Sequence, residues 1–252
     1  MNLYAPNNIF IQIFSNEPSV KQNYNVISSP SPMVVKNILN DKDSIGLVPT
    51  LDLINNKELF VSSKIGISFD GILSSAYLYF VKGERTVDKI HLRGDISVNE
   101  ALISKMLFEE RYSVDPEIIL DTSRELDPDK DYLIAGDENF LDGKFKIGLS
   151  LADEISDLLN LPYVNYLLVS ENREKLEEFN NAFKKIDTLI EDNIESIINE
   201  LELNEEVKNF LTDNLNSIYY ELTPNETEAV QELIKLVYYH GIINDIFDVK
   251  YV

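Results

Sequence analysis

Small residues and hydroxyl groups follow two apolar runs in the first third of the chain. Residues 44–50 (Ser-Ile-Gly-Leu-Val-Pro-Thr) predict a buried parallel strand that ends in a loop. Residues 64–80 predict a strand, a tight bend and a second strand that leaves toward another part of the molecule. Open α/β sheets bind ligands at such strand ends. The first candidates for ligand contacts are therefore Thr50, Gly71, Ser74 and Ser75.

The composition limits what the protein can be. A chain of 252 residues, 44% of them hydrophobic and 26% charged, is long enough for one large domain or two smaller ones. Cys is absent, which excludes disulfides, thiol nucleophiles and Cys-ligated metals. The first residues do not resemble a signal peptide, and no apolar run is long enough to span a bilayer. We expect a cytoplasmic protein that has no membrane partner.

A net charge of −22 argues against polyanionic partners. Nucleic acid and anionic membranes are bound by clusters of Lys and Arg, whereas the 22 basic residues here are scattered among 44 acidic ones. A small anion is still compatible with the charge, because a cleft can gather a few basic groups and amide donors. The two His residues, His91 and His240, are far apart in the sequence, so a metal site has little support. We expect both to be structural.

The order of predicted elements favours two α/β lobes. Strands expected at 8–14, 24–28 and 44–50, with helical segments between them, indicate a parallel sheet with crossover helices. A polar turn at 82–86 favours a lobe boundary, and the strand expected at 163–169 is long enough to return to the first lobe. Ser97 is expected to cap a helix, and from residue 171 onward the pattern is helical. Lobe 1 is thus predicted to comprise residues 1–82 and 166–252, and lobe 2 residues 83–165.

Four segments resemble consecutive signatures of the chorismate dehydratase family of the futalosine route to menaquinone. They are residues 44–50, 66–75, 133–138 (Leu-Ile-Ala-Gly-Asp-Glu) and 151–164. Each motif alone is weak, but four in the right order are fairly specific. The resemblance, over about residues 8–240, implies the fold of type II periplasmic binding proteins, with the second lobe inserted in the first. It also implies a carbon–oxygen lyase that removes water from chorismate to give 3-[(1-carboxyvinyl)oxy]benzoate.

The resemblance assigns roles to particular residues. Ser75 and Asn16 match family residues that face the substrate, although only Glu17 separates Asn16 from Pro18, which shortens the family's turn. Asp137 matches the Asp of an Ile-Gly-Asp motif. The family's Thr-Ser pair falls on residues 98 and 99, where this chain has Val and Asn, a clear departure. The implied catalytic residues are Asn16 and Ser75, and the implied substrate-binding residues are Thr50, Gly71, Ser74, Ser97, Asn99 and Asp137.

The family's reaction suits these residue types. Chorismate loses its ring hydroxyl and an adjacent proton, and aromatisation drives the elimination, so hydroxyl and amide donors are enough. No metal or organic cofactor is expected. The same residues also fit structural roles: Ser74 and Ser75 in a bend, Asn16 and Asp137 as caps or turns.

Two other functions stay open. A sister enzyme that forms dihydroxynaphthoate shares the fold, but that branch has a His where this chain has Gly136 or Asp137. The second alternative is a cytoplasmic solute-binding or sensor protein for a small carboxylate that kept the cleft and lost the chemistry. The altered residues at 98–99 and the shortened turn at Asn16 favour that alternative.

Overall fold

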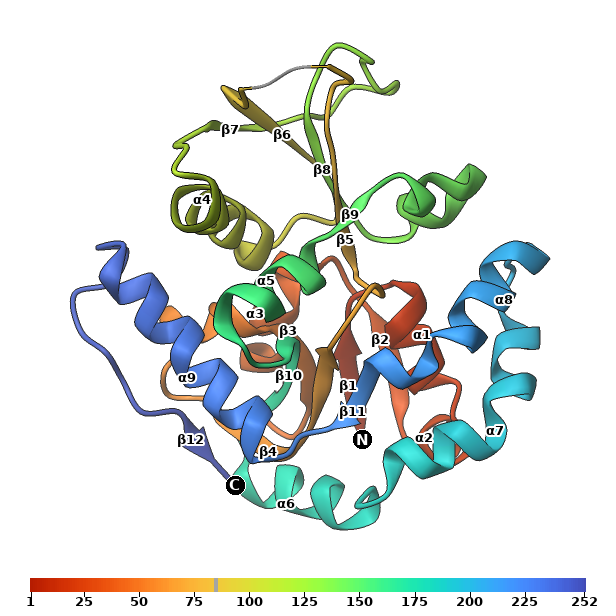
Figure 1. Cartoon of the computed structure of the whole chain (residues 1–252). Coiled ribbons are helices and arrows are strands. Elements are labelled where there is room, and N and C mark those ends of the chain that lie inside the picture. The colour runs from red at the N-terminus through yellow and green to blue at the C-terminus, as the bar shows by residue number, and fades with distance from the viewer. Residues whose placement is uncertain (84–85) are drawn as a thin grey trace.

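A computed structural model describes residues 1–83 and 86–252. Within this part of the chain the strands form two separate sheets, one of seven strands and one of five, flanked by helices (Figure 1). This is the two-lobed, mixed α/β architecture expected from the sequence. The polar turn predicted as a lobe boundary includes residues 84 and 85, which lie outside the described residues.

The larger sheet belongs to lobe 1 and is mixed. Its order is β11-β4-β10-β3-β1-β2, with β12 paired to β4. Parallel pairing joins β1 to both β2 and β3, as the alternation of strands and helices predicts, whereas β10 runs antiparallel to β3 and β4. The strands are β1 (Asn2–Ala5), β2 (Asn25–Ser28), β3 (Ile45–Pro49), β4 (Phe60–Phe69), β10 (Tyr163–Ser170), β11 (Ile218–Glu221) and β12 (Lys250–Tyr251).

The smaller sheet belongs to lobe 2 and has the order β7-β6-β8-β5-β9. Strands β6, β7 and β8 are parallel to one another, so their carboxyl ends share one edge. The strands are β5 (Ala76–Tyr79), β6 (Lys89–Gly94), β7 (Glu117–Leu120), β8 (Tyr132–Ala135) and β9 (Leu149–Ser150). The chain passes between the sheets at residues 70–75 and again at 151–162. The lobe limits at 82 and 165 stay a prediction.

Nine α-helices lie in the described part of the chain, and the C-terminal ones curve around lobe 1 (Figure 1). Four short 3-10 segments accompany them, at 31–33, 50–54, 137–146 and 215–217. The α-helices are α1 (Ile9–Ser15), α2 (Pro18–Asn23), α3 (Val34–Asn40), α4 (Val98–Tyr112), α5 (Leu151–Leu159), α6 (Arg173–Ala182), α7 (Ile186–Glu200), α8 (Glu205–Asp213) and α9 (Pro224–Tyr239).

The segment predicted as the first strand, residues 8–14, is instead helix α1, and the first strand lies earlier, at β1. Five of the seven helix residues are apolar, and all five are buried. The spacing of apolar residues in this segment therefore does not distinguish a helix from a strand. Asn8 decides the local structure, because its side-chain oxygen caps the helix by accepting from the Ile11 amide (3.1 Å). The prediction of a strand at residues 8–14 is therefore wrong.

Two further differences concern the second half of the chain. The apolar pattern at 149–159 predicts a helix from Leu149, but helix α5 begins at Leu151, because the Ser150 hydroxyl caps it by accepting from the Asp153 amide (3.1 Å). The helical region after residue 171 is interrupted by β11 and β12, both paired with β4. These strands of four and two residues are too short to show a periodic pattern. The helix cap predicted at Ser97 is confirmed. Thr223 followed by Pro224 also predicts a helix start, and α9 begins there; both helices have a capping box.

Candidate functional site

Residues from both lobes meet in a buried polar contact that we call the interlobe seam, made of Thr50, Ser75, Asn99, Tyr163 and Asn165. Thr50 follows β3, Ser75 lies in the first crossing segment, and Asn99 is in the first turn of α4. The last two seam residues lie on β10. The structure thus brings together three residues that the sequence placed on three separate elements.

Asn99 is the centre of the seam. It is fully buried, and its side-chain oxygen accepts from the Leu51 amide (2.8 Å), which joins α4 of lobe 2 to lobe 1. Its amide nitrogen donates to the Asn165 carbonyl (2.8 Å), the Asn165 side-chain oxygen (2.9 Å) and the Tyr163 hydroxyl (3.2 Å). Every polar atom of the Asn99 side chain is therefore used inside the protein.

The two seam hydroxyls are occupied as well. Thr50 is fully buried, and its hydroxyl donates to the Val164 carbonyl (2.6 Å). Ser75 is 5% exposed, and its hydroxyl accepts from the side-chain amide of Asn165. Asn165 was missed by the sequence analysis. The available signal was an amide within an otherwise apolar buried strand, because a buried amide must find hydrogen-bond partners.

Two carboxylates of lobe 2 also bind lobe 1. Asp137 accepts from the Ile9 amide (2.8 Å). Asp95 accepts from the Ser31 hydroxyl (2.6 Å) and from the Ser31 amide (3.1 and 3.2 Å to its two oxygens). Burial raises the pKa of Asp137, and the Ile9 hydrogen bond opposes that shift. These contacts join the lobes directly, from carboxylates of lobe 2 to amide and hydroxyl groups of lobe 1.

The other predicted residues have local roles. The Ser74 hydroxyl accepts from the amides of Ala76 and Ala152 (both 3.2 Å), and the Ser97 hydroxyl caps α4 and donates to Glu100. Gly71 has φ = 135°, a conformation that favours glycine, at the start of the crossing segment. Its carbonyl accepts from the Ser150 hydroxyl (3.3 Å). These residues shape the connection between the lobes.

Asn16 lies apart from the seam. It is the C-terminal cap of α1 and lines a separate cavity of about 350 Å³ between α1, α2 and strand β2, together with Tyr24 and Asn25. The backbone N–H of Asn16 donates to the Gln12 carbonyl (2.9 Å). The structure therefore does not bring Asn16 together with Ser75, its expected catalytic partner.

A cavity of about 490 Å³ opens between the lobes, and we call it the interlobe cavity. Pro30 and Pro32, which follow β2, form its lobe 1 side. Its lobe 2 side comes from the residues at the carboxyl ends of three parallel strands, β6, β7 and β8. They are Arg93, Gly94, Asp95, Ile96, Leu120, Asp121, Thr122, Ser123 and Glu138. Ligands of α/β sheets bind at strand ends of this kind.

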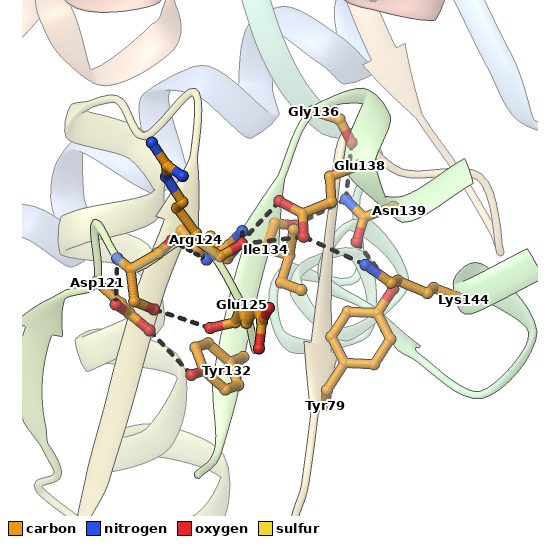
Figure 2. Close-up of polar contacts among 12 residues, drawn as sticks. Tyr79, Asp121, Arg124, Glu125, Tyr132, Ile134, Gly136, Glu138, Asn139 and Lys144 are labelled. Carbon is orange, nitrogen blue, oxygen red and sulfur yellow. Dashed lines mark hydrogen bonds and ion pairs between the residues drawn. The ribbon is translucent and has the colours of Figure 1, made fainter. Parts of the chain in front are cut away.

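Arg93 is the cation of the interlobe cavity, and its side chain is 14% exposed. Its Nε donates to both oxygens of Glu138 (3.0 and 2.8 Å), and its terminal nitrogens donate to the carbonyls of Ser123 (2.6 Å) and Arg124 (3.1 Å). Glu138 also accepts from Lys144 (3.2 Å). In Figure 2, Glu138 and Lys144 lie on one side of this polar cluster, and Asp121 and Arg124 lie on the other.

Acidic groups around the cavity and the seam differ in their pKa. Burial acts on Glu138, but the hydrogen bonds from Arg93 and Lys144 outweigh it and lower its pKa. Hydrogen bonds from Ser123 lower the pKa of Asp121 to about 2. At the lobe contact, burial and then the charge of Glu100 raise the pKa of Asp52 to about 7. The cavity wall therefore holds ionised carboxylates, whereas Asp52 titrates near neutrality.

Neither a metal site nor a membrane span is found within residues 1–83 and 86–252. No group of three or more metal-ligating side chains lies close together there. His240 lies between Glu109 (3.0 Å) and Glu110 (2.9 Å) of α4, and a ring nitrogen of His91 lies 3.1 Å from the Asp131 carbonyl. No described helix is both long and apolar enough to cross a bilayer.

No protein-family model and no curated protein matches this sequence. Solved structures share its fold. Protein AF1704 from Archaeoglobus fulgidus aligns with a TM-score of 0.69 at 14% identity, covering 96% of this chain and 98% of its own. The CA3427 gene product of Candida albicans, described as having the generic periplasmic binding protein fold, aligns with a TM-score of 0.57 at 9% identity, covering 99% and 92%.

A third similar structure is the alkanesulfonate-binding protein SsuA from Xanthomonas axonopodis pv. citri bound to MOPS. It aligns with a TM-score of 0.59 at 11% identity, over 100% of this chain and 97% of that one. At these identities the likeness shows the fold alone. The chain has the periplasmic-binding-protein-like fold.

Proposed function

We propose that this protein binds a small organic carboxylate in the interlobe cavity, with Arg93 as the group that recognises the carboxylate. The observation that carries this proposal is the position of a largely buried guanidinium on the cavity wall, at the carboxyl ends of parallel strands. A volume of about 490 Å³ suits a small organic molecule.

The guanidinium of Arg93 keeps donors for a ligand. Of its five N–H groups, the Nε–H serves Glu138, and one N–H on each terminal nitrogen serves a carbonyl, of Ser123 or of Arg124. The second N–H on each terminal nitrogen has no acceptor within residues 1–83 and 86–252. Arg binds carboxylates through its N–H donors, and we assign these two remaining donors to the carboxylate of the ligand.

The carboxylates on the cavity wall are already hydrogen-bonded. Both oxygens of Asp95 accept from Ser31, and Asp121 accepts from the Ser123 amide (2.8 Å) and the Tyr132 hydroxyl (2.9 Å). Because these acceptors are occupied, they do not compete strongly for the remaining Arg93 donors. The net charge of −22 repels anions at long range. Recognition of a carboxylate therefore depends on short contacts within the cavity, which salt screens less than it screens long-range forces.

Matched ligands test this proposal. Benzoate and benzamide have the same shape, but only benzoate carries the charge that Arg93 recognises. We expect benzoate to bind more tightly by calorimetry, and Arg93→Lys to weaken its binding about tenfold, because Lys keeps the charge and loses the fork. Lys89→Met is the control, because Lys89 lies on the same strand but pairs with Glu117 (3.1 Å), away from the cavity. Equal binding of the two ligands, or equal loss in both variants, contradicts the proposal.

Dehydration of chorismate is the second candidate function. The four sequence segments that resemble chorismate dehydratases favour it, as does the convergence of Thr50, Ser75 and Asn99 at the interlobe seam. In that reaction the ring hydroxyl and an adjacent proton leave together as water, and the ring becomes aromatic. The burial of the seam and the remote position of Asn16 favour binding without turnover.

Incubation with chorismate separates the two candidates. A new aromatic enolpyruvyl ether, detected by chromatography and lost in Ser75→Ala, would support the lyase. Saturable chorismate binding without a product, weakened in Arg93→Lys and not in Lys89→Met, would support the binding protein. The seam and the cavity are thus tested by different variants.

A further inference from the structure

A second cavity lies away from the interlobe cavity and shares none of the described residues that line it. Its volume is about 550 Å³. Three parts of the chain form it: the crossing segment with β5, the region from residue 145 to α5, and helix α8. In Figure 1, α8 lies above α7 on the right-hand side, near the lower part of lobe 2. A molecule in this cavity would contact both lobes.

The floor of this second cavity is aromatic and aliphatic. The rings of Phe145 and Phe210 stack with centroids 4.2 Å apart, and Tyr77, Leu149 and Ile72 continue the apolar wall. Phe145 and Tyr77 are buried, whereas Ile72 is 49% exposed at the cavity. An exposed aliphatic side chain beside stacked aromatic rings is suited to an apolar ligand group.

The rim of the second cavity is acidic. Asp153, Glu206 and Asp213 line it, and the cation Lys146 is paired with Glu206. No cation within residues 1–83 and 86–252 forms an ion pair with Asp153 or Asp213. Arg111, whose charge acts on Asp153, is itself paired with Glu154 (3.2 Å) and Asp157 (3.0 Å). A cation at this rim would therefore meet carboxylates that have no ion-pair partner.

We propose that the second cavity binds a small aromatic cation, an aryl group joined by a short alkyl chain to an ammonium. The aryl group would lie against Phe210 and Ile72, and the ammonium would bind the carboxylates of Asp153 and Asp213. Burial, and then the nearby carboxylate of Asp157, raise the pKa of Asp153. A bound ammonium relieves that unfavourable crowding of like charges. The site is independent of the carboxylate site at Arg93.

Calorimetry with the full chain tests this proposal. The probes are phenethylammonium and 3-phenylpropionate, which have similar apolar groups and opposite charges. We expect saturable binding of the cation at low salt, and at least tenfold weaker binding of the anion. The double variant Asp153→Asn with Asp213→Asn should weaken cation binding about tenfold. The control Glu191→Gln with Asp192→Asn, on exposed positions of α7, should not.

Two variants test the apolar wall. Phe210→Ala should weaken binding of the cation about tenfold by removing the stacked ring. Asn209 is exposed on α8 and lines the cavity, so Asn209→Trp should block the cavity mouth without removing a core side chain. This second variant still tests the proposal in the event that Phe210→Ala disturbs the helix. Equal binding of cation and anion, wild-type affinity in Asn209→Trp, or no saturation up to about 10 mM overturns the proposal. Excess benzoate should leave cation binding unchanged, because the two cavities have separate walls.

Discussion

The interlobe seam and the interlobe cavity lie between the same two lobes but differ in how their polar groups are used. In the seam, Thr50 and Asn99 are fully buried and hydrogen-bonded within the protein. At the cavity wall, Arg93 donates to Glu138, Ser123 and Arg124, and we propose that its remaining N–H groups bind the ligand. The difference shows that hydroxyl and amide groups buried between the lobes bind each other and thereby join the lobes. We propose that ligand recognition uses groups of the second kind, which keep donors after their internal hydrogen bonds are made.

The largest effect is expected from Asn99→Ala. This change removes the acceptor of the Leu51 amide and three donor contacts, and it leaves Asn165 and Tyr163 short of partners. Burying unsatisfied polar groups and opening a small cavity should lower the free energy of unfolding by about 3 to 4 kcal/mol. Urea unfolding measures it. The control is Asn181→Ala at an exposed position of α6, expected to change stability by less than about 0.5 kcal/mol. Similar values for both variants would mean that the seam does not hold the lobes.

The pH dependence of stability should report on the lobe contact through Asp52. Its pKa is about 7 in the folded protein, against 3.8 as the ordinary value, so the folded state binds more protons in this range. Stability from this group is therefore present at low pH and is lost as the pH rises from about 4 to about 7. The loss should be about 2 to 4 kcal/mol.

Asp52→Asn should remove that part of the pH dependence, and unfolding at pH values near 5 and near 8 measures it. Asp187, which burial shifts to a pKa of about 6, contributes to the slope of both proteins and cancels in the comparison. Asp192→Asn, at an exposed position, is the control. If the variant keeps the slope of the wild type, the Asp52 carboxyl is ionised at the lobe contact.

Ser75→Ala distinguishes a seam residue from a ligand residue. The resemblance places Ser75 among the residues that face the substrate, and the removal of a hydroxyl that lines a ligand site would barely affect folding. In the structure Ser75 accepts from the Asn165 amide and is buried, so we expect a loss of about 1 to 2 kcal/mol in unfolding free energy. Thermal unfolding and benzoate affinity are compared with those of Ser63→Ala, at a less buried serine of β4. Unchanged stability with weaker benzoate binding would return Ser75 to the ligand site.

Asp95→Asn should change stability and ligand affinity least, and it should affect both the contact between the lobes and the interlobe cavity. Asp95 binds Ser31 across the lobes and also lines the cavity, so removing its charge weakens one function and assists the other. We expect stability to fall by about 1 kcal/mol, since the amide oxygen still accepts from Ser31. Benzoate affinity should rise about threefold, because one negative charge leaves the cavity wall. A loss of benzoate affinity would contradict the assignment of the ligand to this wall.

Local sequence features determined much of the fold. Ser97 with Glu100 and Thr223 with Glu226 specify helix starts, because a capping box needs only residues three apart. The run at 44–50 specifies a buried strand, and Gly71 marks the bend, because glycine tolerates the φ of 135° found there. These signals depend only on residues close in the sequence, so they act in the same way however the lobes pack. The two-lobed α/β architecture follows from their order.

Only the tertiary structure decided the site. Residues 9–14 are apolar at nearly every position, so their period could not distinguish a helix buried on several sides from a strand. Arg93 is an ordinary strand residue in the sequence, and it becomes the cavity cation because the ends of β6, β7 and β8 meet opposite Pro30 and Pro32. The partners of Asn99 come from residues 51, 163 and 165, which no local pattern relates to it. Whether a polar side chain faces a ligand or another side chain depends on these long-range contacts.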